Sequence, residues 1–557
     1  MNPTQVFGID LGTTYSAISH VDEYGQPTVI LNEDDEPVTS STIFFETPES
    51  VIVGKVAKTS GQADPSRYCE LIKPHMGSND FRREFHGKEY RPEQLSAIIL
   101  SKLKSYAQDK LNCDITDVVI TVPAYFDEQQ RNATEQAGIL AGFTVRGIIP
   151  EPTAAAIAYA ANEEEERTIL VYDLGGGTFD VTVMRVERNQ IRVICVKGDH
   201  NLGGRQWDDC IVAHLSAEWQ RAHGDSDDPL LNRETLQELL NRAEETKKQL
   251  SQRVSVPINV SHAGKKTRVD LSREKFEELT ESLLEKTLAL TRNARAEAAA
   301  LGAPSVDLLL MVGGSSRMPQ VKSRLALEFP GVEQKLFDPE LSVAKGAAIY
   351  ANNTRIQELY RETSEKMFGK TPLPNDKATR ERIAEEVARL IPGGNLKVVQ
   401  TALDTRVINV TSKSFGLETT DPGTRRQEVS YLIKRNTPVP ATKTETFATL
   451  DPNQTAVDLR IIESSAEESK SCELPRDPEH PSNHRLKTIS LHLPPHLPAG
   501  HPIEVTYSVS EDGGRLQVRA VDKQSGNSIE DSVENLSAIQ PREMESMRNE
   551  LRRMKLD

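Results

Sequence analysis

Two copies of one short pattern constrain this chain more than any other feature of its sequence. Segments 7–14 and 170–180 each read as an apolar strand, an aspartate, a tight turn of glycine and threonine, and a return strand. Glycine lets the backbone approach an oxyanion, and the turn N–H groups and threonine hydroxyls can hold phosphate oxygens. An aspartate at the end of a buried strand needs a cation, for which Mg²⁺ is the natural choice. The repeat therefore predicts two phosphate hairpins that grip one nucleotide polyphosphate from opposite sides.

The composition limits the class of protein. At 557 residues the chain is too long for one hydrophobic core, so two to four domains are expected. A net charge of −16 argues against a nucleic-acid partner. No run of roughly eighteen apolar residues predicts a membrane span, and no signal segment is recognised before the first strand. The cysteines form no C-x-x-C pair and favour reduced thiols in a cytoplasmic protein: Cys69, Cys113, Cys195, Cys210 and Cys472.

Two kinds of sequence pattern follow each other along the chain. Up to residue 352, strands alternate with helical patterns, which predicts an α/β fold in two similar halves. Residues 353–405 are charged and helical in pattern, and we interpret them as an insertion or linker. Beyond them, short alternating runs predict an antiparallel β domain. These runs cover 407–410, 429–434, 444–450, 456–463, 488–493, 503–509 and 516–521. Helices are predicted over 98–111, 127–141, 232–252, 272–302 and 540–557.

Several longer strings resemble the DnaK-type family of seventy-kilodalton heat-shock chaperones. In the α/β part these strings are Val122–Phe126, Glu151–Ala156 and Val312–Pro319. In the β part they are Ile433–Thr437, Asp451–Val457, Ile503–Thr506 and Ala520–Lys523. The resemblance implies an actin-like, two-lobed ATPase domain of duplicated ribonuclease-H-like halves over 1–352. It further implies a helical insertion over 353–405, an all-β sandwich that binds peptides over 406–535, and a short C-terminal helix over 536–557 in place of a full helical lid.

The resemblance also implies a function. It predicts an ATP-dependent molecular chaperone of the stress response, in which ATP hydrolysis to ADP and phosphate controls the binding and release of extended hydrophobic segments of unfolded proteins. ATP or ADP and Mg²⁺ are the implied cofactors, with K⁺ as a further candidate ion. J-domain co-chaperones and nucleotide exchange factors are candidate partners. The residues leave open a nucleotide-responsive scaffold, or an exchange factor without its own client cycle, and more distantly a sugar kinase.

Site residues carry over from the resemblance position by position. The implied catalytic residues are Asp10, Lys73, Glu151, Thr178 and Asp180. Nucleotide is expected to bind Gly12, Thr13, Thr14, Tyr15, Gly176, Gly177, Thr178, Glu244, Lys247, Lys248, Ser251, Gly314, Ser315 and Arg317. Mg²⁺ is expected at Asp10 and Asp173, largely through its waters. The implied client groove comprises Leu417, Phe447, Val457 and Leu459, and the implied relay between domains comprises Pro123 and Arg131.

Each of these assignments has a plainer alternative. Lys73 could be an ordinary surface lysine, and Glu151 could merely open a helix that starts with proline. Residues 244–251 could form a solvated charged helix, because their three- and four-residue spacing only places them on one face. Pro123 could be an ordinary turn residue. The groove residues could equally be the core of a plain sandwich.

The chain also departs from the family pattern. Arg205 stands where the family has glutamate in a Gly-Gly-Glu-Asp-Phe-Asp string, and Glu340 stands where an aspartate is usual. Gly147 and Pro150 replace the arginine and asparagine of a J-domain docking surface. The expected linker, residues 405–416, carries few of the usual leucines, which predicts weaker docking. Thr420 and Leu450 replace the methionine and alanine of the arch over the peptide.

Overall fold

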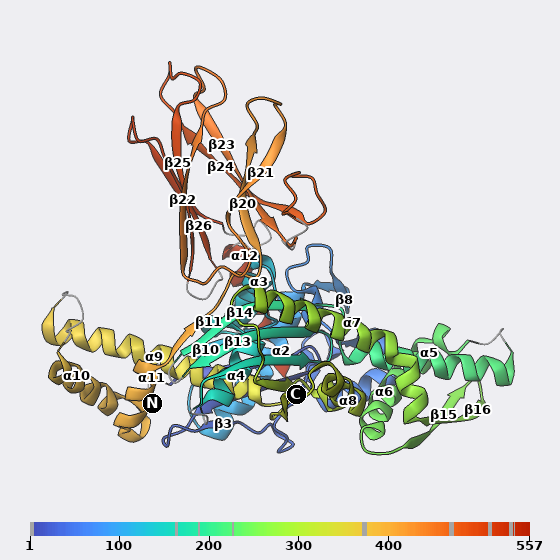
Figure 1. Ribbon diagram of the computed structural model, residues 1–557. Coiled ribbons are helices and arrows are strands. Elements are labelled where there is room, and N and C mark those ends of the chain that lie inside the picture. The colour runs from blue at the N-terminus through green and yellow to red at the C-terminus, as the bar shows by residue number, and fades with distance from the viewer. Residues whose placement is uncertain are drawn as a thin grey trace.

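Figure 1 shows a broad α/β body with an upright pair of β sheets above it. This computed structural model describes residues 5–161, 165–187, 190–224, 228–369, 376–466, 473–510, 515–533, 539 and 541–556. Of the cysteines, Cys472 lies outside these residues. Cys69, Cys113, Cys195 and Cys210 are free thiols, in agreement with the reading of the sequence.

The first half of the body, called lobe I here, is built around a sheet with the strand order β11-β10-β1-β2-β3. Its central strand β1 (Phe7–Leu11) runs parallel to β10 (Asp117–Val122) and antiparallel to β2 (Tyr15–Val21). The helices α2 (Pro92–Leu111) and α3 (Glu128–Leu140) contribute to the core of this lobe. The remaining strands of the sheet are β3 (Pro27–Val29), β4 (Thr39–Ser40) and β11 (Thr144–Pro150).

A smaller unit completes lobe I. It contains the helix α1 (Lys55–Ala63), which packs on a sheet that includes β5, β6 and β7. The strands of this unit are β5 (Ile43–Thr47), β6 (Ser50–Val53), β7 (Tyr68–Cys69), β8 (Arg83–Phe85) and β9 (Lys88–Tyr90).

The second half, called lobe II, repeats the central strand and hairpin of lobe I. Strand β12 (Arg167–Leu174) turns back antiparallel into β13 (Phe179–Glu187), as β1 does into β2. The sheet order is β18-β17-β12-β13-β14-β19. Its other strands are β14 (Gln190–Asp199), β17 (Leu308–Val312) and β18 (Glu333–Leu336). Around it lie α5 (Gly204–His223), α6 (Arg233–Leu250), α7 (Arg273–Ala300), α8 (Pro319–Glu328), β15 (Ser255–His262) and β16 (Lys265–Ser272).

The two lobes are joined where helix α9 (Ser342–Phe368) crosses β1 and helix α4 (Glu151–Ala160). Two glycines allow this close approach. A Cβ atom at Gly346 would overlap the carbonyl of Ala154, and one at Gly8 would overlap the backbone of Ala348. Because backbone lies on the opposing side in both cases, a side chain at either position would push the elements apart.

Helices follow α9, in the region predicted to be a helical insertion. They are α10 (Lys377–Leu390) and α11 (Leu396–Asp404), and they share an apolar cluster with the second half of α9. Gln357 on α9 donates its side-chain amide to the carbonyls of Ala402 and Thr405, at 2.9 and 3.3 Å. These contacts fix the end of α11 immediately before β19 (Arg406–Ile408).

The upright part consists of two four-stranded antiparallel sheets, ordered β21-β20-β23-β24 and β22-β25-β26-β27. Both sheets contribute residues to one apolar core, which includes Leu417, Ile461 and Val505. The strands are β20 (Ser414–Thr420), β21 (Gln427–Ile433), β22 (Ala441–Ala448), β23 (Ala456–Ser464), β24 (Asn483–His492), β25 (Pro502–Val509), β26 (Leu516–Val521) and β27 (Ser528–Ser532).

Strand β19 corrects one part of the sequence interpretation. The sequence pattern places residues 407–410 in the β domain. In the structure, β19 instead pairs in parallel with β14 and extends the sheet of lobe II. Val407 packs against the core that lobe II shares with α4 and α9. Alternation in a short run predicts a strand but cannot say which sheet the strand joins. The linker is therefore docked in this structure, in spite of its few leucines.

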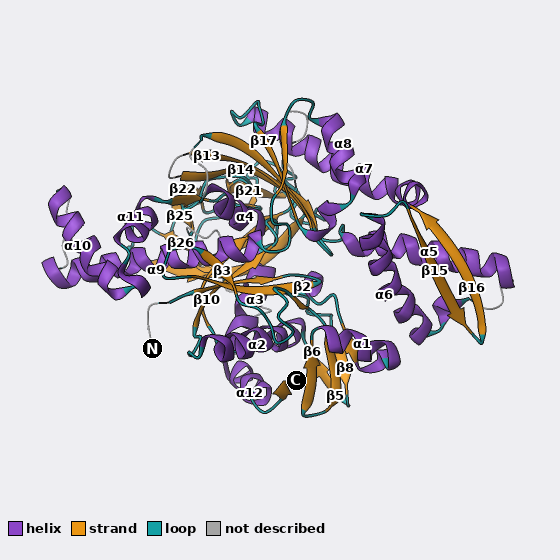
Figure 2. Ribbon diagram, turned by 90° about the horizontal axis from the view of Figure 1, so that it is seen from below, coloured by secondary structure: helices purple, strands orange, loops and turns teal. Residues whose placement is uncertain are grey.

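The last described segment returns to lobe I. Helix α12 (Pro541–Leu551) packs on α3 and α2, and β28 (Lys555–Leu556) pairs in parallel with β6 (Figure 2). Leu551 is buried in the core of lobe I together with Ile539. Ion pairs join Arg91 to Glu543 at 3.0 Å and Lys88 to Glu550. Along the chain, the β sandwich therefore lies between β19, which joins the sheet of lobe II, and α12, which packs on lobe I.

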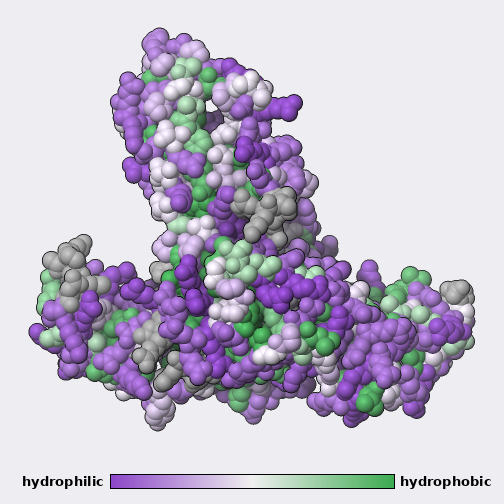
Figure 3. All heavy atoms as spheres, in the orientation of Figure 1, coloured by the Kyte–Doolittle hydropathy of each residue, from purple (hydrophilic) through white to green (hydrophobic). Residues whose placement is uncertain are grey.

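Figure 3 shows hydrophilic residues over much of the visible face, with hydrophobic residues scattered among them. In the described part of the chain, every helix is either too short or too polar to cross a bilayer.

We predict that Gly346→Ala destabilises the α/β body, because the added methyl group meets the Ala154 carbonyl. The free energy of unfolding should fall by about 2–3 kcal/mol. Urea unfolding measures this through the two buried tryptophans of lobe II, Trp207 and Trp219. Asn353→Ala, on the same helix, is the matched control and should change stability by less than about 0.5 kcal/mol. Equal stability of the two variants would contradict the close-packing argument.

Candidate functional site

A cavity of about 550 Å³ lies between the two lobes. It is lined by both phosphate hairpins, by the loop after β17, and by α5 and α6. Every residue predicted to bind nucleotide lines it except Gly177, and every predicted catalytic residue lines it except Asp180. Gly177 and Asp180 belong to the second phosphate hairpin, other residues of which line the cavity. Residues from distant parts of the sequence therefore converge on one cleft, as the paired hairpins suggested.

The turns of the two phosphate hairpins face each other across this cleft. A Cβ atom at Gly176 would overlap the Thr14 hydroxyl, and one at Gly177 would press on the side chain of Thr13. Gly203, at the start of α5, packs in the same way against the backbone of Gly177. The glycines are therefore required for close approach, and they leave backbone N–H groups and threonine hydroxyls at the cleft surface.

Four carboxylates surround Lys73 at the floor of the cleft. Lys73 is buried and forms an ion pair with Glu151, the first residue of α4. Asp10 lies near the end of β1 and accepts a hydrogen bond from the Thr121 hydroxyl at 3.0 Å. Asp173 and Asp180 stand opposite each other on β12 and β13. Glu151, Asp173 and Asp180 are at least nine-tenths buried as whole residues, and Asp10 is partly exposed.

This crowding disfavours the ionised acids. Burial, and then the charge of Glu151, raise the pKa of Asp10 to about 7, although Lys73 and Thr121 oppose the shift. The same two causes raise the pKa values of Asp173 and Asp180 well above the usual range. One lysine cannot balance four acids, so a bound cation would favour their ionised forms.

The residues of the floor fit a hydrated Mg²⁺ ion. The Oδ1 atom of Asp180 is buried and has no hydrogen-bond partner among the described residues. Within the same residues, no three histidine, cysteine or acidic side chains gather closely enough to ligate a metal directly. Mg²⁺ retains several waters in most protein sites, and carboxylate oxygens suit contact through those waters.

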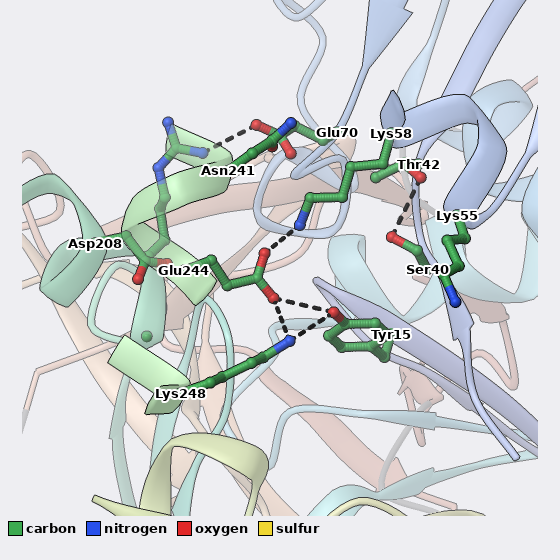
Figure 4. Close-up of polar contacts among 12 residues, drawn as sticks. Tyr15, Ser40, Thr42, Lys55, Lys58, Glu70, Asp208, Asn241, Glu244 and Lys248 are labelled. Carbon is green, nitrogen blue, oxygen red and sulfur yellow. Dashed lines mark hydrogen bonds and ion pairs between the residues drawn. The ribbon is translucent and has the colours of Figure 1, made fainter. Parts of the chain in front are cut away.

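At the other end of the cleft, Glu244 on α6 collects three partners (Figure 4). It forms ion pairs with Lys58 on α1 and with Lys248, the latter at 2.8 Å, and accepts a hydrogen bond from the Tyr15 hydroxyl at 3.0 Å. Lys248 also donates to the Tyr15 hydroxyl at 2.8 Å. Burial opposes the charge of Glu244, but Lys58 and Lys248 outweigh it and hold its pKa below the usual range.

Lys247 and Ser251 share this helix but have different partners. Lys247 donates to the carbonyl of Gly204 at 2.8 Å and pairs with Asp208 at 2.8 Å. Ser251 donates to the carbonyl of Lys247 at 3.3 Å. Arg317, in the loop after β17, forms an ion pair with Glu340 at 3.5 Å. Glu340, noted in the sequence only as a departure, therefore lies beside the residue expected to stack on adenine.

Sequence reasoning missed several residues that line the cleft. Lys58, Glu70 and Asp208 all do so. Each makes an ion pair with a residue distant in the sequence, as in Lys58–Glu244 and Arg205–Glu70. Only Arg205 gave a signal, as a departure from the family pattern, and that signal did not identify its partner.

The predicted relay residues lie where the sandwich meets the body. Pro123 follows β10, and Arg131 on α3 donates to the carbonyls of Phe126 and Ala124 in the turn between them, at 3.2 and 3.4 Å. The Ser412 hydroxyl, just before the sandwich, donates to the same Phe126 carbonyl at 3.3 Å. The turn that Arg131 braces is therefore in direct contact with the β part.

The predicted client residues divide into two pairs. Leu417 and Leu459 are buried in the core of the sandwich, with 3 and 1 % of their surface exposed. Phe447 and Val457 are only partly buried and pack against that core. An ion pair of 3.1 Å joins Arg425, in the loop between β20 and β21, to Asp451, in the loop between β22 and β23. The role of these residues in peptide binding stays a prediction.

Comparisons with known proteins agree along the whole chain. A family model described as Hsp70 protein matches residues 6–84, 80–359 and 353–557. The chaperone protein DnaK of Halobacterium salinarum, from two strains (ATCC 29341 and ATCC 700922), is 34% identical over 558 aligned residues. The alignment covers 99% of this chain and 78% of each relative.

We predict that Asp10→Asn stabilises the metal-free protein increasingly as the pH rises from about 5 to 7. Folded Asp10 keeps its proton up to about pH 7, whereas the ordinary value is 3.8, so the wild type loses stability as the pH rises between them. Asparagine has no proton to lose. The difference should grow by on the order of 1 kcal/mol per pH unit.

Urea unfolding in the presence of a chelator, at several pH values in this range, measures the effect. The exposed Asp34→Asn is the matched control. A constant difference between Asp10→Asn and the wild type would show that Asp10 is already ionised in the folded protein.

Proposed function

The chain belongs to the Hsp70 family, and we propose that it is an ATP-dependent molecular chaperone. In this proposal the α/β body is a two-lobed, actin-like ATPase. The β sandwich binds extended hydrophobic segments of unfolded proteins. The observation that carries the ATPase assignment is the pair of opposed phosphate hairpins above a floor of buried acids.

The geometry suggests a role for each group in the cleft. The turn N–H groups and hydroxyls of Thr13, Thr14 and Thr178 would hold the phosphates from two sides. Lys73 would neutralise charge on the transferred phosphoryl group, and its contact with Glu151 keeps it oriented. Glu151 and Asp180 would orient the attacking water and accept its proton.

Mg²⁺, when bound beside Asp10 and Asp173, would supply positive charge for the phosphates and the acids. The raised pKa values of these acids support this assignment, because a cation relieves the repulsion that burial creates. Binding of Mg²⁺, of K⁺ and of co-chaperone partners is part of this proposal.

Coupling between the two activities would run through the linker and the relay turn. Strand β19 extends the lobe II sheet directly, so a movement of β14 must move the start of the sandwich. Arg435 in the sandwich donates to the carbonyl of Val196 on β14 at 2.7 Å, and Asn436 contacts Glu297 on α7 at the same interface. These contacts support nucleotide-dependent release of clients.

We predict that Lys73→Ala and Thr178→Ala each lower single-turnover ATP hydrolysis by about 10²–10³-fold. Both variants should fold normally, as judged by the tryptophan unfolding curve. The control is Lys110→Ala, which removes an exposed lysine of lobe I that pairs with Asp35. Unchanged hydrolysis in both site variants would refute the active-site assignment.

Coupling is tested by the release of a labelled hydrophobic peptide. We expect ATP with Mg²⁺ to speed release from the wild type and from Lys110→Ala. If the rate of peptide release does not change with ATP, in a chain that still hydrolyses ATP, a scaffold or exchange factor is favoured over a chaperone cycle.

A further inference from the structure

Arg205 joins the two lobes across the cleft. Its guanidinium pairs with Glu70 of lobe I at 3.0 Å, the contact drawn from Glu70 in Figure 4. Both side chains are about three-quarters buried, with 23 and 21 % exposed. An ion pair that is so far removed from water is less screened than a surface pair.

Each partner is held in place from its own side of the cleft. The Tyr68 hydroxyl donates to Oε2 of Glu70 at 2.8 Å, which leaves Oε1 for Arg205. Asp209, one turn along α5, accepts from Nε of Arg205 at 3.0 Å and leaves Nη1 for Glu70. Because both ends are oriented beforehand, little side-chain freedom is lost when the lobes meet.

The backbone around this pair belongs to the phosphate-binding walls. The N–H of Arg205 donates to the carbonyl of Gly176 in the second phosphate hairpin at 2.8 Å. Glu70 lies three residues before Lys73, in the segment that follows β7. The ion pair therefore connects the second phosphate hairpin to the segment that carries the cleft lysine, across the gap between the lobes.

We propose that Arg205 and Glu70 form a latch across the cleft, beside the second phosphate hairpin, which slows the escape of bound nucleotide. The latch also holds Lys73 at a fixed position relative to the second phosphate hairpin. Both residues are positioning residues, and neither is assigned a contact with the phosphates. The glutamate that is usual at position 205 would face Glu70 with a like charge, so the latch depends on the arginine of this chain. The proposal rests on nucleotide binding in this cleft.

A double-mutant cycle with Glu70→Gln, Arg205→Gln and the double variant tests the latch. The main readout is the release rate of a fluorescent ADP analogue, with Mg²⁺, in stopped flow. Each single variant should release the analogue about tenfold faster than the wild type, and the double variant no faster than either single variant. Arg205→Lys keeps the charge but not the two-sided contact, and its rate should be intermediate. Arg221→Gln, which breaks the outer Arg221–Glu218 pair of α5, is the matched control and should match the wild type.

Two outcomes would overturn the proposal. If the increases in release rate of the two single variants multiply in the double variant, the two residues act separately. Slow single-turnover hydrolysis in Arg205→Gln but not in Glu70→Gln would mean that Arg205 acts on the phosphates directly.

A second measurement keeps the latch distinguishable from the proposed function. In nucleotide-free protein, amide hydrogen exchange of residues 70–73 and 175–178 should rise in both single variants and stay unchanged in Arg221→Gln. If the wild type binds no adenine nucleotide, the ATPase assignment fails, while exchange still reports on the latch. If nucleotide binds but neither exchange nor release changes, the latch alone is refuted.

Discussion

The structure depends on an unfavourable electrostatic arrangement at the floor of the cleft. Four acids are packed around Lys73, and burial makes their simultaneous ionisation costly. Such a cluster persists only because the surrounding strands are fixed by the cores of both lobes. The arrangement becomes favourable when cationic charge enters with a ligand, so the cleft suits a metal-chelated anion.

The lobes are held together at two levels. At the base, Gly8 and Gly346 let α9 pack backbone to backbone on β1 and α4, which is a short-range and rigid contact. At the mouth, ion pairs such as Lys58–Glu244 cross the gap, and charged contacts can separate without disrupting a core. This contrast describes a hinge: a tightly packed base and a mouth closed by reversible contacts.

Much of this architecture could be predicted from the sequence, for physical reasons. The phosphate hairpins were visible because glycine, threonine and aspartate have local roles in a turn, and long helices were visible through their periodicity. Contacts set by tertiary packing were not. Nothing local identifies Glu70 as the partner of Arg205, or assigns β19 to the sheet of lobe II. The 540–557 segment was predicted as a helix, yet its packing on α2 and α3 has no local signal.

The return of α12 to lobe I has a consequence for how the protein is made. The core of that lobe contains Phe7 and Ile9 from the first strand, but also Ile539 and Leu551. During synthesis, this core therefore stays incomplete until residues 539–551 have left the ribosome. Lobe II and the sandwich have cores of their own and are free to fold earlier, so lobe I begins before them in the sequence but is completed after them.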